Sequence, residues 1–230
     1  MAQAKIQGIK GCVFDAYGTL FDFNSAVERC RGELGENADA LSKMWRDKQL
    51  QYTWLRSLMG RHADFWQITG DALDYAMQSL GIGDAAMRIK LMNLYRTLDV
   101  FPEVVAVIAR LKAGGLKTAI LSNGTPEMLE AAAKATRIDS LFDAIVSIET
   151  AGIYKPHPSV YGAALDSLSL EKDAVCFISS NAWDAHGASA FGMKTVWCNR
   201  YGQARENLPG SPDVQVSTLA ELGSILGLGG

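Results

Sequence analysis

Short runs of apolar residues alternate along the chain with longer segments whose apolar residues recur every three or four positions. The short runs favour β-strands and cover residues 9–14, 117–121, 144–148, 174–178 and 194–198. The longer segments favour α-helices at 102–112, 126–135, 159–168 and 183–191. Thr218 and Glu221 have the spacing of a capping box, which predicts one more helix near the C-terminus. The alternation predicts an α/β fold, in which a mostly parallel sheet is flanked by helices on both faces.

Residues 20–98 break this alternation, because they show helical periodicity, almost no strand signal and no proline. Helices are predicted at 65–80 and 85–98, and an earlier helix carries a stripe expected to face the core: Leu41, Met44, Trp45, Lys48, Tyr52, Leu55 and Met59. We therefore predict a Rossmann-like core made of residues 1–19 and 99–230, with 20–98 inserted as a helical cap. Since ligands bind beyond the carboxyl ends of parallel strands, the cap should cover the binding site as a lid.

Composition narrows the class of protein. Of the 230 residues 48% are apolar, which is enough for a substantial core. The net charge of −3 disfavours nucleic acid or an anionic membrane as a partner. No apolar stretch approaches the ~18 residues of a spanning helix, and the N-terminus lacks the pattern of a secretory signal. The cysteines are isolated in sequence, so we expect reduced, mostly buried thiols and a cytoplasmic location: Cys12, Cys30, Cys176 and Cys198.

Polar side chains follow the predicted strands, and the carboxyl ends of parallel strands meet at one edge of a sheet. The side chains directly after the strands are Asp15, Ser122, Asn123, Ser179 and Asn181. Lys155 follows another strand by a short loop. These residues are far apart in sequence, yet the fold should gather them at one site.

Asp15 is a candidate nucleophile, because a carboxylate at the tip of a buried strand is costly to desolvate unless a partner stabilises it. Two residues later stands Tyr17, where an enzyme that expels an alkoxide would need a carboxylic acid. A phenol with a pKa near ~10 protonates a leaving group poorly at neutral pH. Asp15 followed by Tyr17 therefore favours a reaction whose leaving group departs without a proton.

Four motifs in order carry a resemblance to a known family: Asp15-Ala-Tyr-Gly-Thr19, Ser122-Asn123-Gly124, Tyr154-Lys155-Pro156 and Ser179-Ser180-Asn181-Ala-Trp-Asp184. With these motifs the chain resembles the haloacid dehalogenase superfamily and, more narrowly, its L-2-haloacid dehalogenases. The resemblance covers nearly the whole chain. It implies hydrolysis of a short L-2-haloalkanoic acid to a D-2-hydroxy acid and halide, with inversion at the carbon.

Under this resemblance Asp15 attacks the carbon that bears the halogen and forms an ester. Lys155 would keep the Asp15 carboxylate ionised. Backbone N–H groups after Asp15, at Ala16 and Tyr17, and those near Ser122 and Asn123 would hold the substrate carboxylate. The resemblance also implies that Arg46, Asn123 and Trp183 receive the halide, while the apolar walls around the alkyl group are Tyr17, Leu50 and Phe65.

The second half of the implied reaction hydrolyses the ester. Asp184 would position or deprotonate the attacking water, and Tyr161 would hydrogen-bond near Asp184 or Lys155. The remaining predicted members of the catalytic site are Thr19, Ser179 and Asn181. Each candidate also has a structural explanation: a solvated Lys or Arg, a helix cap, a first-turn acid or an ordinary core residue.

No metal or other cofactor is expected, because the first motif lacks the second acid that the family's Mg²⁺ phosphatases use. His62, His157 and His186 show no metal-ligand spacing and are expected on the surface or in loops. The expected partner is a small 2-haloacid, and the resemblance suggests a homodimer. Two alternatives stay open: a phosphatase or phosphonatase of the same superfamily, the latter with Lys43 or Lys48 as a Schiff-base lysine, and a non-catalytic binder of small anions.

Overall fold

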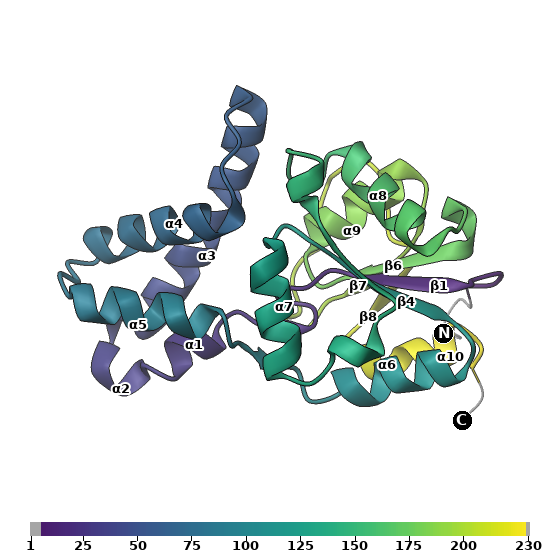
Figure 1. Ribbon diagram of the computed structural model, residues 1–230, viewed down its shortest axis with the longest axis horizontal. Helices are drawn as coiled ribbons and strands as arrows, with labels where there is room; N and C mark the ends of the chain where they lie inside the picture. The colour runs from purple at the N-terminus through teal and green to yellow at the C-terminus, as the bar shows by residue number, and fades with distance from the viewer. Residues whose placement is uncertain (1–5, 229–230) are drawn as a thin grey trace.

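In the computed structural model, which describes residues 6–228, the centre is a six-stranded parallel sheet (Figure 1). The strand order is β5–β4–β1–β6–β7–β8, and each neighbouring pair is parallel. The bounds are β1 Gly11–Phe14, β4 Lys117–Ser122, β5 Ala144–Ser147, β6 Val175–Ser179, β7 Lys194–Cys198 and β8 Val214–Val216. The predicted α/β fold with a Rossmann-like parallel sheet is confirmed. The edge strand β8 was not predicted, because its three residues form too short a run to give a pattern.

Helices flank both faces of the sheet. α8 and α9 lie on one side, and α6 and α10 lie on the other (Figure 1). Their bounds are α6 Val104–Ala113, α7 Pro126–Ala135, α8 Pro158–Leu168, α9 Ala182–Phe191 and α10 Leu222–Ile225, with short 3₁₀ turns at Asp139–Leu141, Ile148–Thr150, Lys172–Ala174 and Leu219–Glu221. The capping box of Thr218 and Glu221 is present. Every residue of β1 and β6 is buried, as expected for central strands covered on both faces.

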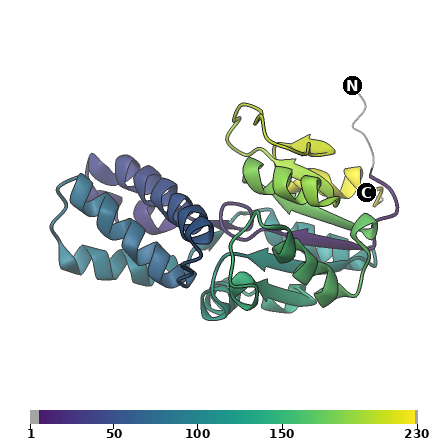
Figure 2. The ribbon, with the colours of Figure 1, turned by 90° about the horizontal axis from the view of Figure 1, so that it is seen from above.

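A second group of helices lies beyond the end of the sheet toward which β1 runs (Figures 1 and 2). It comprises α1 Ser25–Glu28, α2 Arg31–Leu34, α3 Asn37–Met59, α4 Phe65–Ser79 and α5 Ala85–Tyr95. The chain enters and leaves this group through β2 Phe21–Asp22 and β3 Asp99–Val100, which pair antiparallel. The helix α4 begins where it does because the Asp64 side chain accepts a hydrogen bond from the backbone N–H of Gln67.

The predicted buried stripe of α3 is partly wrong. The buried residues of this helix are Ala38, Leu41, Trp45, Gln49 and Thr53. Leu55 is 40% exposed and Met59 is 66% exposed. The C-terminal part of α3 extends past α4 and so lacks a neighbour to cover these side chains (Figure 1). The polar side chains of Gln49 and Thr53 are buried because they find hydrogen-bond partners inside the protein.

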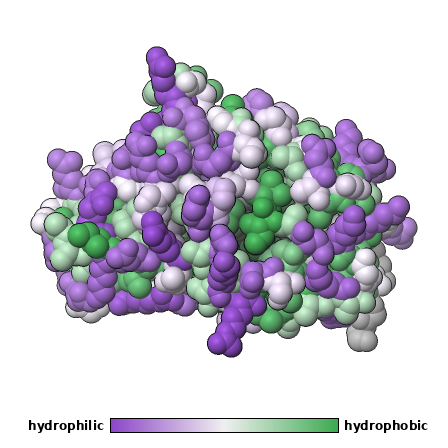
Figure 3. All heavy atoms as spheres, viewed as in Figure 1, coloured by the Kyte–Doolittle hydropathy of each residue, from purple (hydrophilic) through white to green (hydrophobic). Residues whose placement is uncertain are grey.

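Polar and apolar side chains are interspersed over the face of the molecule in Figure 3. Between residues 6 and 228, no helix combines the length and apolar character needed to cross a membrane. The cysteines are free and buried: Cys12, Cys30, Cys176 and Cys198.

Candidate active site

Three neighbouring strands at the middle of the sheet end in polar residues. Asp15 directly follows β1, Ser122 is the last residue of β4 and Ser179 is the last residue of β6. Because β1 lies between β4 and β6, the three residues stand side by side at one edge of the sheet. Gly18 makes the tight turn after Asp15 possible, since its φ of 92° is a conformation that side-chain-bearing residues rarely adopt.

Both oxygens of the buried Asp15 carboxylate have hydrogen-bond donors. The Lys155 ammonium lies 3.0 Å from Oδ1. The Thr19 hydroxyl and the Asn181 amide donate to Oδ2, at 2.9 and 2.8 Å. The Thr19 oxygen also accepts from the backbone N–H of Ser180 at 2.8 Å, so its proton is directed at Asp15. This arrangement holds the carboxylate in one orientation.

Lys155 joins the Asp15 carboxylate to a second buried carboxylate, because its Nζ is also 2.9 Å from Asp184 Oδ2. Burial alone would lower the pKa of Lys155, but the two carboxylates outweigh it and raise the pKa above its ordinary value. Burial raises the pKa of Asp184 to about 6, against the opposing effect of Lys155. The cluster therefore holds one ammonium between two acids in a region that excludes water.

Tyr161 fixes the other oxygen of Asp184, because its hydroxyl donates to Oδ1 at 2.8 Å. Burial raises the pKa of Tyr161, so this hydroxyl stays protonated and acts as a donor. The contact depends on Gly187 in α9, where a Cβ atom would meet both the Tyr161 hydroxyl and Pro156 Cβ at 2.6 Å.

The predicted carboxylate cradle lies at two of these strand ends. Ser122 Oγ accepts from the backbone N–H of Gly124 at 3.1 Å. Asn123 Oδ1 accepts from the backbone N–H of Lys155 at 3.2 Å, which ties the β4 loop to the lysine loop. Ser179 Oγ accepts from the backbone N–H of Asn181 at 3.1 Å, in the same type of turn as Ser122. Ala16 is buried within the turn after Asp15.

Arg46 of α3 reaches from the helical group to this edge of the sheet. Its guanidinium donates to the Tyr17 carbonyl and to Asn181 Oδ1, both at 3.3 Å. It also lies 4.9 Å from the centre of the Phe23 ring. Arg46 thereby connects α3 to the amide that holds Asp15. The resemblance groups Arg46 with Asn123 and Trp183 around the halide, and this shared role stays a prediction.

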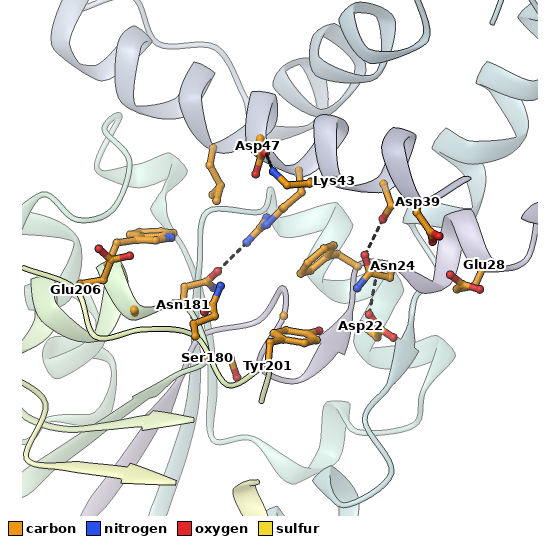
Figure 4. A pocket seen from close by; sticks show the side chains of 18 residues that line it. Asp22, Asn24, Glu28, Asp39, Lys43, Asp47, Ser180, Asn181, Tyr201 and Glu206 are labelled. Carbon is orange, nitrogen blue, oxygen red and sulfur yellow. Dashed lines mark hydrogen bonds and ion pairs between the residues drawn. The ribbon is translucent and has the colours of Figure 1, made fainter. Parts of the chain in front are cut away.

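A pocket of about 850 Å³ opens beside Arg46 and is lined by predicted residues from both parts of the chain, Leu50, Asn181 and Trp183 among them. Figure 4 shows Lys43 and Asp47 of α3 on one side of it and Ser180 and Asn181 on the other. Phe65 lies deeper, with its ring centre 5.6 Å from that of Tyr17. Of the predicted substrate-binding residues, the pocket thus brings together Arg46, Leu50 and Trp183. The others named for the site, Tyr17, Phe65, Ser122 and Asn123, are buried and are not among the residues that line it, and neither is Asp15.

A family model described as a haloacid dehalogenase-like hydrolase matches residues 9–192. The chain belongs to this family. It is 45% identical to (S)-2-haloacid dehalogenase 1 of Pseudomonas sp. strain CBS-3, over 95% of this chain and 96% of the relative. It is 44% identical to (S)-2-haloacid dehalogenase 4A of Burkholderia cepacia, over 96% of each chain. The resemblance inferred from the motifs is confirmed.

Solved structures agree with these relatives of the haloacid dehalogenase-like family. An L-2-haloacid dehalogenase from Xanthobacter autotrophicus, solved with chloropropionic acid covalently bound, has a TM-score of 0.88 and 33% identity. The match covers 95% of this chain and 98% of that one. A dehalogenase solved as an intermediate complex has a TM-score of 0.94 and 43% identity, over 96% and 98% of the two chains.

Sequence reasoning missed several side chains around this hydrolase site. The sequence indicates Gln49 only as a neighbour of Arg46 on its helix. No sequence pattern indicates Trp54, whose ring packs edge-on against that of Trp183 with centres 5.4 Å apart. The expectation that the histidines lie on the surface or in loops is wrong for His186, which is buried in α9 because the packing of that helix covers it.

Proposed function

We propose that this protein hydrolyses short L-2-haloalkanoic acids to D-2-hydroxy acids and halide. The observation that carries the proposal is the Asp15 carboxylate, held by Lys155, Thr19 and Asn181 while a tyrosine stands two residues later. This geometry supports an oriented nucleophile without a general acid beside the leaving group. Relatives named (S)-2-haloacid dehalogenase, at 44–45% identity, support the same reaction.

In the first half of the reaction an Asp15 oxygen attacks C2 of the substrate from the side opposite the halogen. A C–O bond forms, the carbon–halogen bond breaks, and the halide leaves with the bonding electron pair. The carbon inverts, so an L substrate gives a D product. Lys155 supports this step because its ammonium lies 3.0 Å from Oδ1 and orients the carboxylate for attack.

Substrate binding divides between the two parts of the chain. The backbone N–H groups of Ala16 and Tyr17, together with Ser122 and Asn123, hold the substrate carboxylate. Arg46, Asn123 and Trp183 receive the departing halide, with Arg46 supplying the positive charge. Tyr17, Leu50 and Phe65 enclose the alkyl group. We also propose that residues 20–98 act as the cap and residues 1–19 and 99–230 as the core.

In the second half of the reaction water attacks the carbonyl carbon of the Asp15 ester. Asp184 accepts a proton from that water, for which its fixed position between Lys155 and Tyr161 suits it. The acyl–oxygen bond breaks, the hydroxy acid leaves with a proton, and Asp15 is regenerated. The oxygen gained by the product therefore comes from Asp15, and the water oxygen stays on the enzyme. Ser179 holds the loop that carries Asn181 and Asp184.

We further propose that turnover needs no metal ion. Lys155 already places a positive charge between Asp15 and Asp184, the two acids available at the first and last motifs. Within residues 6–228, no group of three His, Cys, Asp or Glu side chains has the arrangement of a metal site. Full activity after exhaustive chelation is expected, and a loss restored by Mg²⁺ would contradict it.

Free, buried cysteines support a cytoplasmic location. The protein is also proposed to work as a homodimer.

The phosphonatase alternative requires a cap lysine that forms a Schiff base with the substrate. Lys43 forms an ion pair with Asp47 at 2.6 Å, and Lys48 donates to Gln51 at 2.7 Å. The hydrogen bond to Asp47 raises the pKa of Lys43, so this amine stays in the ammonium form, which is not nucleophilic. The dehalogenase reaction is the one that the site and the relatives favour together.

The proposal is tested by halide release from each enantiomer of 2-chloropropionate, with phosphate release from phosphate esters measured in parallel. Chloride release from the L enantiomer alone is expected. A single turnover in ¹⁸O-labelled water with enzyme in excess should give an unlabelled hydroxy acid, because its oxygen comes from Asp15. Direct labelling of the product, or phosphate release without halide release, would overturn the proposal, and the Asp15→Asn variant should be inactive.

A further inference from the structure

A buried network of polar side chains connects three helices of the helical group behind Arg46. Gln49 of α3 is only 1% exposed. Its Nε2 lies 2.7 Å from the Thr69 hydroxyl of α4 and 3.1 Å from the Tyr95 hydroxyl of α5. Its Oε1 accepts from the Arg46 guanidinium at 2.8 Å. A fully buried amide in a mainly apolar layer is retained only if its hydrogen bonds are made, so its partners determine its orientation.

Thr69 determines which way the Gln49 amide points. The Thr69 hydroxyl lies 2.6 Å from the carbonyl oxygen of Phe65, which can only accept, so Thr69 donates its single proton there. Toward Gln49 the Thr69 oxygen can then only accept, which requires the NH₂ end of the amide. The carbonyl end of Gln49 must consequently face Arg46. The reverse orientation would place amide and guanidinium donors against each other and leave Thr69 without its donor.

Tyr95 extends the network to the strand-end turn. Its hydroxyl lies within hydrogen-bond distance of both ends of the Gln49 amide, at 3.1 and 3.2 Å. Its ring stacks on Tyr17, with centres 5.5 Å apart and planes at 25°. Arg46 in turn contacts the Tyr17 carbonyl and Asn181. The orientation set by Thr69 is therefore transmitted through Gln49 to the guanidinium that lines the pocket.

We propose that Gln49, oriented by Thr69, is a positioning residue that holds the Arg46 guanidinium where the halide departs. This inference rests on the proposed function, since it concerns the halide produced at that site. Gln49 accepts from Nη1, while Nη2 donates to the Tyr17 carbonyl and to Asn181, so these contacts together hold the guanidinium in one orientation at the pocket. An arginine without this partner would sample several rotamers and would lose entropy when it bound halide.

The test compares Gln49→Met and Thr69→Val with Thr53→Val as the matched control. Thr53 is a buried polar residue one turn further along α3, and its hydroxyl donates to the Leu50 carbonyl rather than to Arg46. Halide release is measured for 2-chloropropionate and 2-bromopropionate. Bromide affinity is measured separately, at constant ionic strength, by quenching of tryptophan fluorescence, because Trp183 lines the same pocket as Arg46. Thermal unfolding reports the structural cost of each change.

Gln49→Met should slow chloride release about tenfold, the scale of one hydrogen bond to a charged group. Bromide release should slow less, because the better leaving group relies less on Arg46, and bromide affinity should fall. Thr69→Val should change these quantities in the same direction but less, and Thr53→Val should leave the chloride-to-bromide rate ratio unaltered. Equal slowing with both substrates, or unchanged bromide affinity in Gln49→Met, would overturn the proposal.

The binding measurement separates this proposal from the proposed function. If the native protein releases no halide from any 2-haloacid, the proposed function fails, yet bromide binding weakened by Gln49→Met still supports the role of Gln49. If the native protein releases halide but Gln49→Met binds bromide normally, the proposed function stands and the positioning role is wrong. A native protein that binds no bromide also overturns the positioning role.

Discussion

The Lys155 ammonium lies 2.9 Å from the Asp184 carboxylate, and their side chains are only 1% and 0% exposed. A buried ion pair of this kind contributes little net stability, because desolvation offsets most of the attraction. The pair is better explained by a role in the proposed reaction, because the same ammonium also lies 3.0 Å from the Asp15 carboxylate. One lysine thus contacts both acids that the proposed reaction uses, the nucleophile and the base.

Replacing Lys155 with methionine should destroy activity and destabilise the fold. The variant leaves two buried carboxylates without their counter-ion, so one of them must take up a proton. We expect at least a hundredfold loss of halide release and a loss of about 3–5 kcal/mol in unfolding free energy. Halide-release kinetics and urea denaturation measure the two effects.

Lys194→Met is the control for that variant. Lys194 pairs with Asp213 at the surface, where the lysine side chain is 49% exposed, so its removal should cost less than about 1 kcal/mol. It should leave halide release unchanged. Equal losses in the two variants would mean that Lys155 has no special role.

The raised pKa of Asp184 predicts how activity depends on pH. The pKa is about 6 in the folded protein, and a protonated Asp184 cannot accept a proton from water. Ester hydrolysis should therefore slow about tenfold for each pH unit below this value, while ester formation should fall less. Rapid-quench measurement of the enzyme-bound ester across pH 4–8 would show accumulation at the acidic end. A level of ester that does not change with pH would contradict the assignment of Asp184.

The free energy of unfolding should also depend on the protonation of Asp184, and it should fall as the pH rises. The folded pKa of Asp184 lies above its usual value of 3.8, so between pH 3.8 and about 6 the folded state holds a proton that the unfolded chain has released. The contribution of this group to stability is therefore complete below pH 3.8 and is lost as the pH rises through 6. Asp184→Asn lacks this group, so its stability curve should not show the loss, and the difference between the native and variant curves should isolate it.

Asp184→Asn should also trap the covalent intermediate. Asn181 and Thr19 still hold Asp15, so the attack on the substrate can proceed, but the amide of Asn cannot accept a proton from water. One equivalent of halide should be released in a burst, and the enzyme mass should increase by the substrate without its halogen. Mass spectrometry of a peptide containing Asp15 would locate the ester. A variant that turns over normally would show that another group activates the water.

The sequence was sufficient to place the residues at the strand ends, but not those that depend on how the helices dock. Asp15, Ser122 and Ser179 could be grouped in advance because a parallel sheet brings its carboxyl ends together whatever the surrounding packing is. The orientation of α3 could not be derived in this way. Its buried face includes Gln49 and Thr53, whose hydrogen bonds permit burial that hydropathy does not indicate.

The hydrogen-bond partners of Arg46 could likewise not all be predicted from the sequence. Its position three residues before Gln49 on one helical face was evident from sequence spacing. Its hydrogen bond to Asn181 joins residues 135 positions apart in sequence and depends on how α3 lies against the carboxyl end of β6. No local pattern encodes such a distance. The motif resemblance supplied Arg46 as a candidate, and only the three-dimensional arrangement could supply its neighbours.

Gly187→Ala tests whether the close packing behind Asp184 matters for activity. The added methyl would lie 2.6 Å from both the Tyr161 hydroxyl and Pro156 Cβ, so Tyr161 must move and its 2.8 Å hydrogen bond to Asp184 must break or lengthen. We expect the free energy of unfolding to fall by about 1–3 kcal/mol because of overpacking, with ester hydrolysis slowed more than ester formation.

Gly162→Ala is the control, since a Cβ at that position in α8 meets open space and should stabilise the helix by up to about 1 kcal/mol. Thermal unfolding and burst kinetics of the two variants measure these effects, and a Gly187→Ala enzyme with native ester hydrolysis would show that Tyr161 does not hold Asp184 for its reaction.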